Sequence, residues 1–296
     1  MISAADEGLR LGDARGAVDA VTIAFADPRA GLFGLARLGV ARAGDAPRAS
    51  GLAMLFEGAR PAAVLAAGDV DAGPAPDWGR VEVPGLGTGV GTPLAAWSVR
   101  FEDAAGRGFA LDLEALSPPA ELSPGDAAGG GLRGYEQLCR VRGEVRANGR
   151  PRRIEALGQR GHLWGVPDWD RLALTRTVSA WLDDGEGVTL AAARPAGARG
   201  HEDEATWSAL LTPEEAALVD DARLSTTYDG EGRQRRAGLE LWVREEDGVP
   251  RRAAGEVVCG STLELGELRL DSAFLRWRMD GRPGAGRYDI LRRAAG

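Results

Sequence analysis

Short apolar stretches that end in turn signals recur along the whole chain, and this spacing constrains the fold more than any other feature. Among the 296 residues are 43 Gly and 16 Pro, and many of them separate these stretches. Short strands punctuated in this way are typical of β-sandwiches and β-barrels. The predicted strands cover residues 21–25, 32–40, 51–56, 62–66, 97–101, 109–113, 133–145, 152–160, 171–182, 188–193, 239–243, 254–258, 263–270, 273–279 and 288–291. The pattern therefore predicts an all-β chain.

One segment carries helix signals instead. Thr212 is a suitable N-cap, Pro213 would occupy the first helical position, and Glu215 completes a capping box. We therefore expect one short helix over residues 213–220.

Residues 117–131, SPPAELSPGDAAGGG, have the composition of a linker. The chain is also longer than a typical domain of about 100–200 residues. We therefore expect an N-terminal β domain over residues 1–116, a linker over 117–131 and a C-terminal β domain over 132–296.

The charge balance disfavours whole classes of partner. The chain has 36 basic and 44 acidic residues, a net charge of −8, and Arg as its only basic residue type apart from two His. Such a surface repels phosphate backbones and anionic lipid. No apolar run approaches the ~18–20 residues that span a bilayer, and the acidic N-terminus does not resemble a secretory signal. With only two Cys, the chain fits a reducing compartment. We expect a cytoplasmic protein that binds neither nucleic acid nor membranes.

Common cofactor and metal motifs are not matched. Residues 85–91, GLGTGVG, lack the spacing of a dinucleotide-binding loop and are more typical of a β-turn region. The HEDE stretch at residues 201–204 is more typical of an exposed acidic loop than of a metal site. No pair of cysteines has zinc-ribbon spacing. We therefore expect no metal and no cofactor.

The segment from 134 to 169 is the most informative, because Asn148-Gly149 is a strong signal for a two-residue hairpin turn. That turn places Tyr135 opposite His162, and side chains two residues apart then share one face. The polar and aromatic end of this face comprises Tyr135, Gln137, Arg160, His162 and Trp164. Its turn-proximal half is small and apolar. The other face of the first strand, with Glu136, Arg140, Arg142 and Glu144, is expected to face water.

This face predicts a pocket with apolar walls and a few convergent polar groups, as in a ligand-binding barrel. The alternative is a structural cluster in which His162 and Arg160 hydrogen-bond to nearby carbonyl groups. The spacing leaves both interpretations open.

The same segment carries a family resemblance. GYEQ, the Asn-Gly hairpin and GQRGHLWGVPDW resemble the tandem lipocalin-like family, which includes carotenoid hydratases, related terpenoid cyclases and many bacterial proteins. Many relatives have approximately G-x-R-D-H-S-W-G-x-R-D-W. The residues that match are Gly158, Arg160, His162, Trp164, Gly165, Asp168 and Trp169. Residues 25–40 and 96–101 look like the first domain of that family.

The resemblance implies two lipocalin-like (calycin-type) antiparallel β-barrels or half-barrels packed together around a hydrophobic ligand. In carotenoid hydratases a His-x-Trp pair and a nearby acid protonate a polyene double bond, and His162 and Trp164 match that pair. The Asp that precedes this His in many relatives is Gly161 here. The resemblance therefore does not supply the acid.

These observations favour a cofactor-independent enzyme that hydrates, cyclises or isomerises an apolar, unsaturated, terpenoid- or lipid-like molecule. His162 would be the proton donor or an orienting group. The catalytic candidates are His162, Trp164 and Tyr135, and the ligand-binding candidates are Gln137, Arg160, Asp168 and Trp169. A carrier of hydrophobic molecules and a partner-binding β protein are the alternatives. A buried carboxylate beside His162 favours the enzyme, an open apolar cavity without one favours the carrier, and no cavity favours the third.

Overall fold

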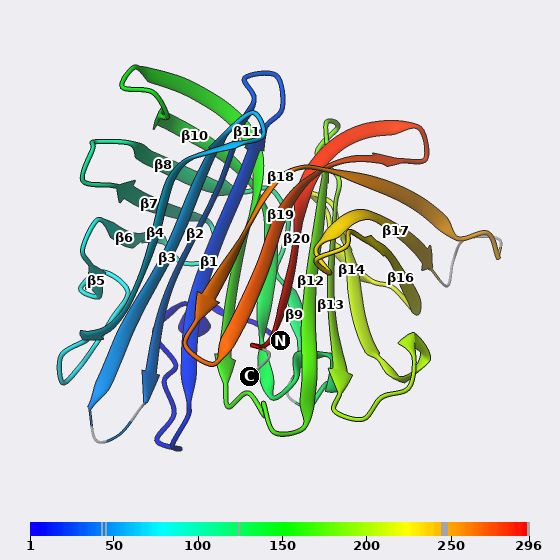
Figure 1. Ribbon diagram of the computed structural model, residues 1–296, viewed down its shortest axis with the longest axis horizontal. Coiled ribbons are helices and arrows are strands. Elements are labelled where there is room, and N and C mark those ends of the chain that lie inside the picture. Colours follow the sequence, from blue (N-terminus) through cyan, green and yellow to red (C-terminus); the bar gives the residue numbers. More distant parts are fainter. Residues whose placement is uncertain (43, 45, 124, 244–247, 295–296) are drawn as a thin grey trace.

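Strands make up most of the computed structural model, which describes residues 1–42, 44, 46–123, 125–243 and 248–294. They form two antiparallel, barrel-like sheets that pack side by side (Figure 1). The predicted all-β fold class with two packed lipocalin-like sheets is confirmed.

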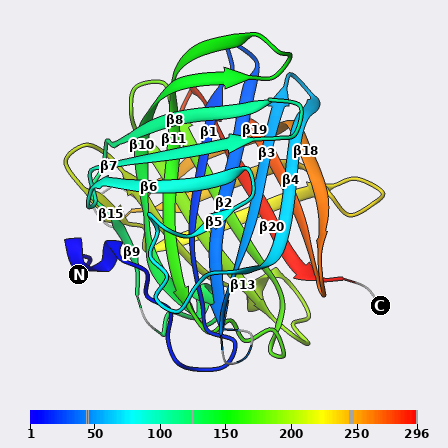
Figure 2. The ribbon, with the colours of Figure 1, turned by 90° about the vertical axis from the view of Figure 1, so that its left-hand side faces the viewer.

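The first sheet has the strand order β4-β3-β2-β1-β11-β10-β8-β7-β6-β5, and β9 also pairs with β10. Its strands are β1 (Val18–Asp27), β2 (Leu32–Arg42), β3 (Pro47–Glu57), β4 (Arg60–Asp71), β5 (Glu82–Val83), β6 (Leu86–Thr92), β7 (Ala96–Glu102), β8 (Gly108–Ala115), β9 (Ala120–Leu122), β10 (Leu132–Arg146) and β11 (Pro151–Gly165). Figure 2 shows β6, β7 and β8 crossing in front of β1–β4, so the sheet curls over its own inner face.

The second sheet has the order β15-β14-β13-β12-β20-β19-β18-β17-β16. Its strands are β12 (Leu172–Leu182), β13 (Gly187–Pro195), β14 (Ala205–Leu211), β15 (Ala216–Leu218), β16 (Asp221–Tyr228), β17 (Gln234–Trp242), β18 (Arg251–Leu265), β19 (Leu268–Met279) and β20 (Arg282–Arg293). The helical segments in the described part of the chain are short 3-10 turns: η1 (Ala4–Glu7), η2 (Ala127–Gly129) and η3 (His201–Asp203).

The β10–β11 hairpin belongs to the first sheet, although we expected it with the C-terminal strands. It pairs with β1 on one side and with β8 on the other. The reason is that β1 is buried along most of its length and needs a ladder partner on both edges, which β2 and β11 provide. The linker composition before the hairpin carries no information about which sheet the hairpin joins. The domain boundary at residues 117–131 stays a prediction.

The predicted helix over residues 213–220 is wrong. Residues 213–215 belong to the turn between β14 and β15, residues 216–218 are β15 itself, and Leu211 pairs with Ala216. Thr212 caps this turn, because its hydroxyl accepts a hydrogen bond from the Glu215 backbone N–H at 3.2 Å. A capping signal followed by so few residues does not sustain a helix, since isolated helices shorter than about 12–15 residues are marginal.

Four other points of the sequence analysis also need correction. The predicted strand 263–270 contains the turn at residues 266–267, residues 86–92 form β6, and the strands β14 and β16 were not predicted. The HEDE stretch is not fully exposed, since the side chain of Glu204 is buried and pairs with Arg176 and Arg194. Buried ion pairs of this kind cannot be recognised from one segment alone.

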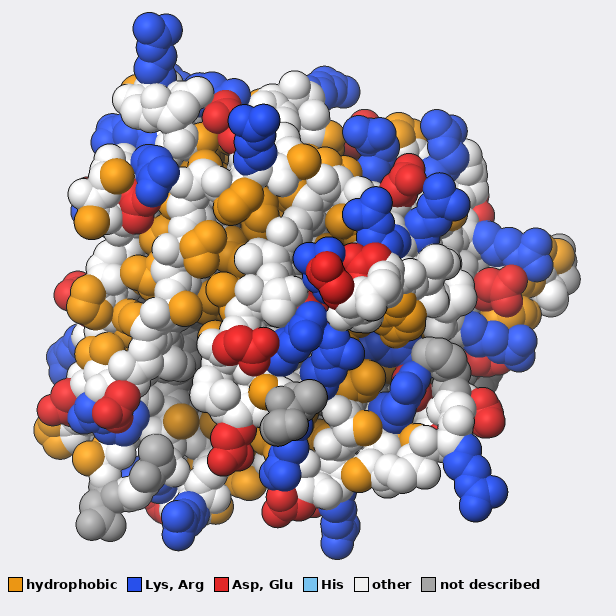
Figure 3. Space-filling model, viewed as in Figure 1, with side chains coloured by type: hydrophobic (Ala, Val, Ile, Leu, Met, Phe, Trp, Pro, Cys, Tyr) orange, Lys and Arg blue, Asp and Glu red, His pale blue; other side chains and the backbone are white. Residues whose placement is uncertain are grey.

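Hydrophobic side chains fill three regions: the inside of the first sheet, the inside of the second sheet, and the contact between the two sheets. The contact region includes Phe33 and Phe56 from the first sheet and Phe274 from the second, with ring centroids 5.7 and 6.1 Å apart. Figure 3 shows hydrophobic side chains gathered over β1–β4, with Arg and carboxylate side chains interspersed elsewhere on that face. Within the described residues, no helix is long and apolar enough to cross a membrane.

Candidate functional site

The predicted register of the β10–β11 hairpin is confirmed. Tyr135 pairs with His162, and Gln137 pairs with Arg160. The five predicted side chains on this face all point into the first sheet and are buried. The rings of His162 and Trp164 lie 4.9 Å apart, and Arg160 donates a hydrogen bond to the Tyr135 hydroxyl at 2.9 Å.

Two carboxylates that the sequence analysis did not predict pair with Arg160 and His162 in this cluster. Asp19, on β1, lies 2.8 Å from Nε2 of His162 and is fully buried. Glu7, in η1, forms an ion pair with Arg160 and accepts a hydrogen bond from the Tyr135 hydroxyl at 3.2 Å. Burial raises the pKa of Tyr135, so this phenol stays protonated.

The cluster inside the first sheet leaves almost no space for a ligand. The cavity beside Arg160 has a volume of about 10 Å³ and is lined by Trp78 and Trp97, among others. That volume is close to the space one water needs. Several buried polar atoms here, including Nδ1 of His162 and Nε1 of Trp164, have no hydrogen-bond partner among the described residues. The interior is polar, with Arg160 paired to Glu7 and His162 hydrogen-bonded to Asp19, but it is filled by protein.

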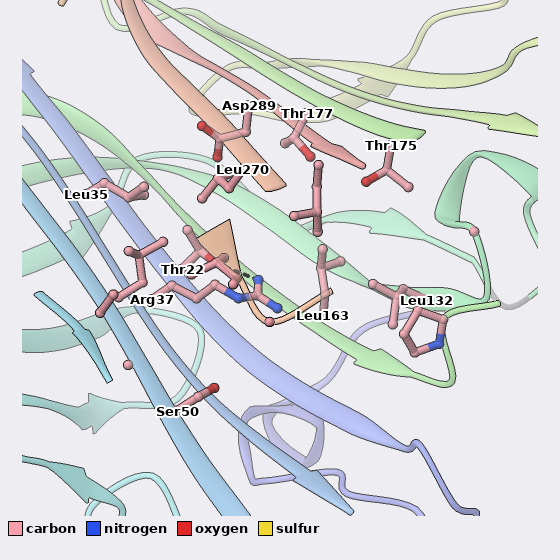
Figure 4. Close-up of a pocket in the computed structure, with 18 of the residues that line it drawn as sticks. Thr22, Leu35, Arg37, Ser50, Leu132, Leu163, Thr175, Thr177, Leu270 and Asp289 are labelled. Atoms are coloured by element: carbon pink, nitrogen blue, oxygen red, sulfur yellow. Dashed lines mark hydrogen bonds between the residues drawn. The ribbon is translucent and has the colours of Figure 1, made fainter. Parts of the chain in front are cut away.

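A much larger cavity lies between the two sheets, with a volume of about 530 Å³ (Figure 4). Its apolar walls include Leu35, Leu52, Leu132, Leu163, Trp169, Leu172, Leu270 and Leu291. Its polar groups include Thr22, Arg37, Glu136, Thr175, Thr177, Arg287 and Asp289. Ligand pockets have volumes of about 300–1,000 Å³ and combine apolar walls with a few polar groups. The inter-sheet cavity therefore has the size and lining of a small-molecule site.

Glu136 is the buried acid of the inter-sheet cavity. It follows Tyr135 in the strand and so points to the opposite face, where the second sheet covers it and leaves it 6% exposed. Gln159 donates a hydrogen bond to Oε2 of Glu136 at 2.8 Å. Burial raises the pKa of Glu136, and the positive charge of Arg287 partly opposes this shift. The expectation that Glu136 faces water is wrong, since alternation along a strand does not reveal what packs on the second face.

Gly161 makes room for the Glu136 carboxyl group. The two residues are paired across the hairpin, and a Cβ atom on Gly161 would lie 2.4 Å from Oε1 of Glu136 and 2.6 Å from its Cδ. No side chain fits there while Glu136 keeps this position. The carboxyl group thus lies beside the position where many lipocalin-like relatives have Asp. A signal for this was present in the sequence, since the Asn-Gly register pairs Glu136 with the missing acid position.

Arg37 and Arg287 reach the same cavity from the two different sheets. Arg37 donates a hydrogen bond to the Thr22 hydroxyl at 3.3 Å (Figure 4). Arg287 lies 3.4 Å from Oδ2 of Asp289, and the other carboxylate oxygen of Asp289 accepts a hydrogen bond from Ser272 at 2.5 Å. The cavity therefore contains two guanidinium groups beside a buried acid.

The structure separates the remaining two predicted site residues. Trp169 is partly buried and lines the inter-sheet cavity. Asp168 is exposed, and its carboxylate lies 3.5 Å from Arg171, away from both clusters. The roles predicted for all seven residues stay predictions. Among the described residues, no group of three His, Cys, Asp or Glu side chains is placed to hold a metal ion.

Comparisons with known proteins agree with this architecture. A family model described as "Domain of unknown function (DUF7064)" matches residues 3–294. No curated protein matches the sequence.

Solved structures with the same fold include CghA, with a TM-score of 0.64 and 14% identity over 95% of this chain and 89% of that one. An AttH-like protein from Nitrosomonas europaea has a TM-score of 0.61 and 12% identity over 93% and 92% of the two chains. Kievitone hydratase from Nectria haematococca has a TM-score of 0.59 and 8% identity over 95% and 90%. The resemblance to the lipocalin-like barrel proteins is thus confirmed at the level of fold.

Proposed function

Because the chain belongs to the DUF7064 family, whose function is unknown, we propose a function from the site itself: the protein binds an apolar, unsaturated small molecule between its two sheets and performs acid–base chemistry on it. The observation that carries this proposal is the 530 Å³ inter-sheet cavity, whose mainly leucine walls enclose a buried carboxyl group. The fold shared with kievitone hydratase and CghA agrees with this class of chemistry.

Glu136 is the proton donor in this proposal. It would transfer its proton to one carbon of a double bond, leaving a carbocation on the adjacent carbon and a carboxylate on Glu136. Burial favours the protonated acid that this step requires. Gln159 orients the carboxyl group, and the ring of Trp169 stabilises the cation through its face.

The fate of the cation determines the product. Water that adds to it gives an alcohol and returns a proton to Glu136, which is a hydration. Loss of a neighbouring C–H proton to Glu136 gives an isomer. Attack by a second double bond in the same molecule, followed by proton loss to Glu136, gives a ring. In each case Glu136 recovers its proton, so no cofactor is consumed.

His162, Tyr135 and Trp164 act as positioning residues in this proposal, although the resemblance implies a catalytic role for His162 and Trp164. The cavity inside the first sheet, where these three side chains lie, has room for about one water. The carboxylates beside them already have partners, since Glu7 pairs with Arg160 and Asp19 with His162. They hold the β10–β11 hairpin whose other face carries Glu136.

A substitution that fills the cavity tests the binding part of the proposal. Thr177 lines the cavity, so Thr177→Phe should block it, whereas Thr227 is exposed on β16 and Thr227→Phe is the matched control. Native mass spectrometry of protein purified from its own host should show a bound apolar molecule in the wild type and the control, and none in Thr177→Phe. Equal ligand occupancy in all three proteins would contradict the inter-sheet site.

A carrier of the same molecule is the second candidate, and the predominantly apolar lining favours it. Glu136→Gln separates the two functions because Gln keeps the shape of the side chain but donates no acidic proton. If the protein is an enzyme, Glu136→Gln retains substrate while the wild type contains product. For a hydration, the two molecules differ in mass by one water. If the protein is a carrier, both proteins contain the same molecule.

A further inference from the structure

We propose that the ligand of the inter-sheet cavity carries a carboxylate at one end and that Arg37 and Arg287 bind this group. This inference rests on the proposed function and adds the chemical class of the ligand. It is carried by the position of two guanidinium groups at the cavity, one of which, Arg37, has no ion-pair partner among the described residues.

Arg37 is the first part of the evidence. Its side chain extends from β2 into the cavity, where Nη1 donates to the neutral hydroxyl of Thr22 (Figure 4). No carboxylate oxygen of the described residues lies within 4.0 Å of its guanidinium nitrogens, the distance that defines an ion pair. A guanidinium group has five N–H donors, so most of this group's donors are left for a ligand. Arg37 is partly buried, and a charged group that is partly removed from water is stabilised by a counter-charge.

Arg287 is the second part, and it approaches from the opposite sheet. It is 4% exposed, and its Nε atom is buried without a hydrogen-bond partner among the described residues. Its counter-charge is Asp289, at 3.4 Å, and that carboxylate is also held by Ser272. Asp289 can therefore balance one of the two guanidinium groups, but not both.

The other acids at the cavity, Glu136 and Glu264, are not ion-pair partners of Arg37. Glu136 is bonded through Oε2 to the Gln159 amide, and its burial favours the neutral, protonated form. Glu264 is exposed to solvent in the β18–β19 hairpin. Neither acid forms an ion pair with Arg37 among the described residues, so a carboxylate on the ligand would be the direct partner of this guanidinium group.

A carboxylate matches this site in geometry as well as in charge, because a planar guanidinium group binds a carboxylate through two parallel hydrogen bonds. The leucine-rich walls would then hold the hydrocarbon part of the same molecule. An amphiphilic acid thus satisfies both linings, whereas a neutral hydrocarbon leaves Arg37 without a partner and an amine repels it.

Three molecules with one carbon skeleton test this inference: farnesoic acid, farnesol and farnesylamine, titrated calorimetrically into the full-length protein. Farnesoic acid should bind about 10- to 100-fold more tightly than farnesol, a difference of about 1.4–2.8 kcal/mol, because its carboxylate makes charge-assisted hydrogen bonds. Farnesylamine should bind more weakly than farnesol.

Arg37→Gln should remove most of the preference for farnesoic acid over farnesol. The affinity of this variant for farnesol should differ from that of the wild type by less than about twofold. Arg37→Lys, which keeps the charge, should retain part of the preference and controls for a folding defect. Arg153→Gln alters an exposed Arg on β11 and should bind like the wild type.

Equal affinities for farnesoic acid and farnesol, unchanged in Arg37→Gln but lost in Thr177→Phe, would overturn the carboxylate inference and leave the inter-sheet site standing. No binding of any of the three compounds would instead overturn the proposed function.

Discussion

The two faces of the β10–β11 hairpin carry two buried polar clusters that differ in charge balance and in free volume. On the inner face of the first sheet, Arg160 meets Glu7 and His162 meets Asp19, around a cavity of about 10 Å³. On the outer face, Glu136 borders a cavity of about 530 Å³.

This difference indicates which cluster holds the protein together and which one binds a ligand. In the inner cluster, side chains of β11 pair with residues far away in the sequence, since Arg160 pairs with Glu7 and His162 with Asp19. These contacts hold η1 and β1 against β11. The outer cluster contains Arg37, which has no ion-pair partner among the described residues, and it borders a cavity large enough for a small molecule. Adjacent residues of one strand thereby serve different purposes, because strand side chains alternate between faces. Four substitutions test this division.

Glu7→Ala should have the largest effect on stability. It leaves the buried guanidinium group of Arg160 without a counter-charge, which typically costs about 3–5 kcal/mol of unfolding free energy. Urea unfolding measures this loss. Glu155→Ala breaks an exposed pair with Arg142 and should leave the free energy of unfolding nearly unchanged. If both variants were equally stable, the inner cluster would not be structural.

His162→Ala should cost about 1–3 kcal/mol, because it removes the buried partner of Asp19. Its affinity for farnesoic acid should stay close to that of the wild type. The opposite combination, an unchanged melting temperature with lost ligand capture, would show that His162 acts in the functional site, as the resemblance implies.

Gly161→Ala should cost about 1 kcal/mol, since the new methyl group occupies the space of the Glu136 carboxyl group while the loss of a glycine favours folding slightly. In the double variant with Glu136→Ala the steric conflict is absent, so the two effects should not add. Purely additive unfolding free energies would mean that these side chains do not compete for space.

Glu136→Gln should change how the free energy of unfolding depends on pH. Burial raises the pKa of Glu136 above its ordinary value of 4.5, so the unfolded chain ionises this group first as the pH rises. The wild type therefore loses stability with rising pH from about 4.5 until the folded-state pKa is passed. Glu136→Gln lacks this contribution, so the variant should gain stability relative to the wild type over that range. Parallel stability curves would indicate an unperturbed carboxyl group.

The sequence predicted the register of the site well, because an Asn-Gly turn determines which residues lie opposite each other along the whole hairpin. It could not predict Glu7 and Asp19, since antiparallel pairing brings β1 to β11 across nearly half of the chain. The burial of Glu136 was also inaccessible: the alternation shows which face a residue occupies, and the second sheet that covers this face comes from distant strands. The helix at 213–220 was mispredicted because Thr and Glu cap turns as well as helices.

Photo-crosslinking is the measurement that tests the inter-sheet site most directly. A farnesoic acid analogue with a diazirine at its apolar end would be bound to the full-length protein, illuminated and mapped by peptide mass spectrometry. The inter-sheet site predicts labels at Leu172 or Leu270, which line the large cavity, and their loss in Thr177→Phe. Labels at Trp78 or Trp97, inside the first sheet, would contradict it.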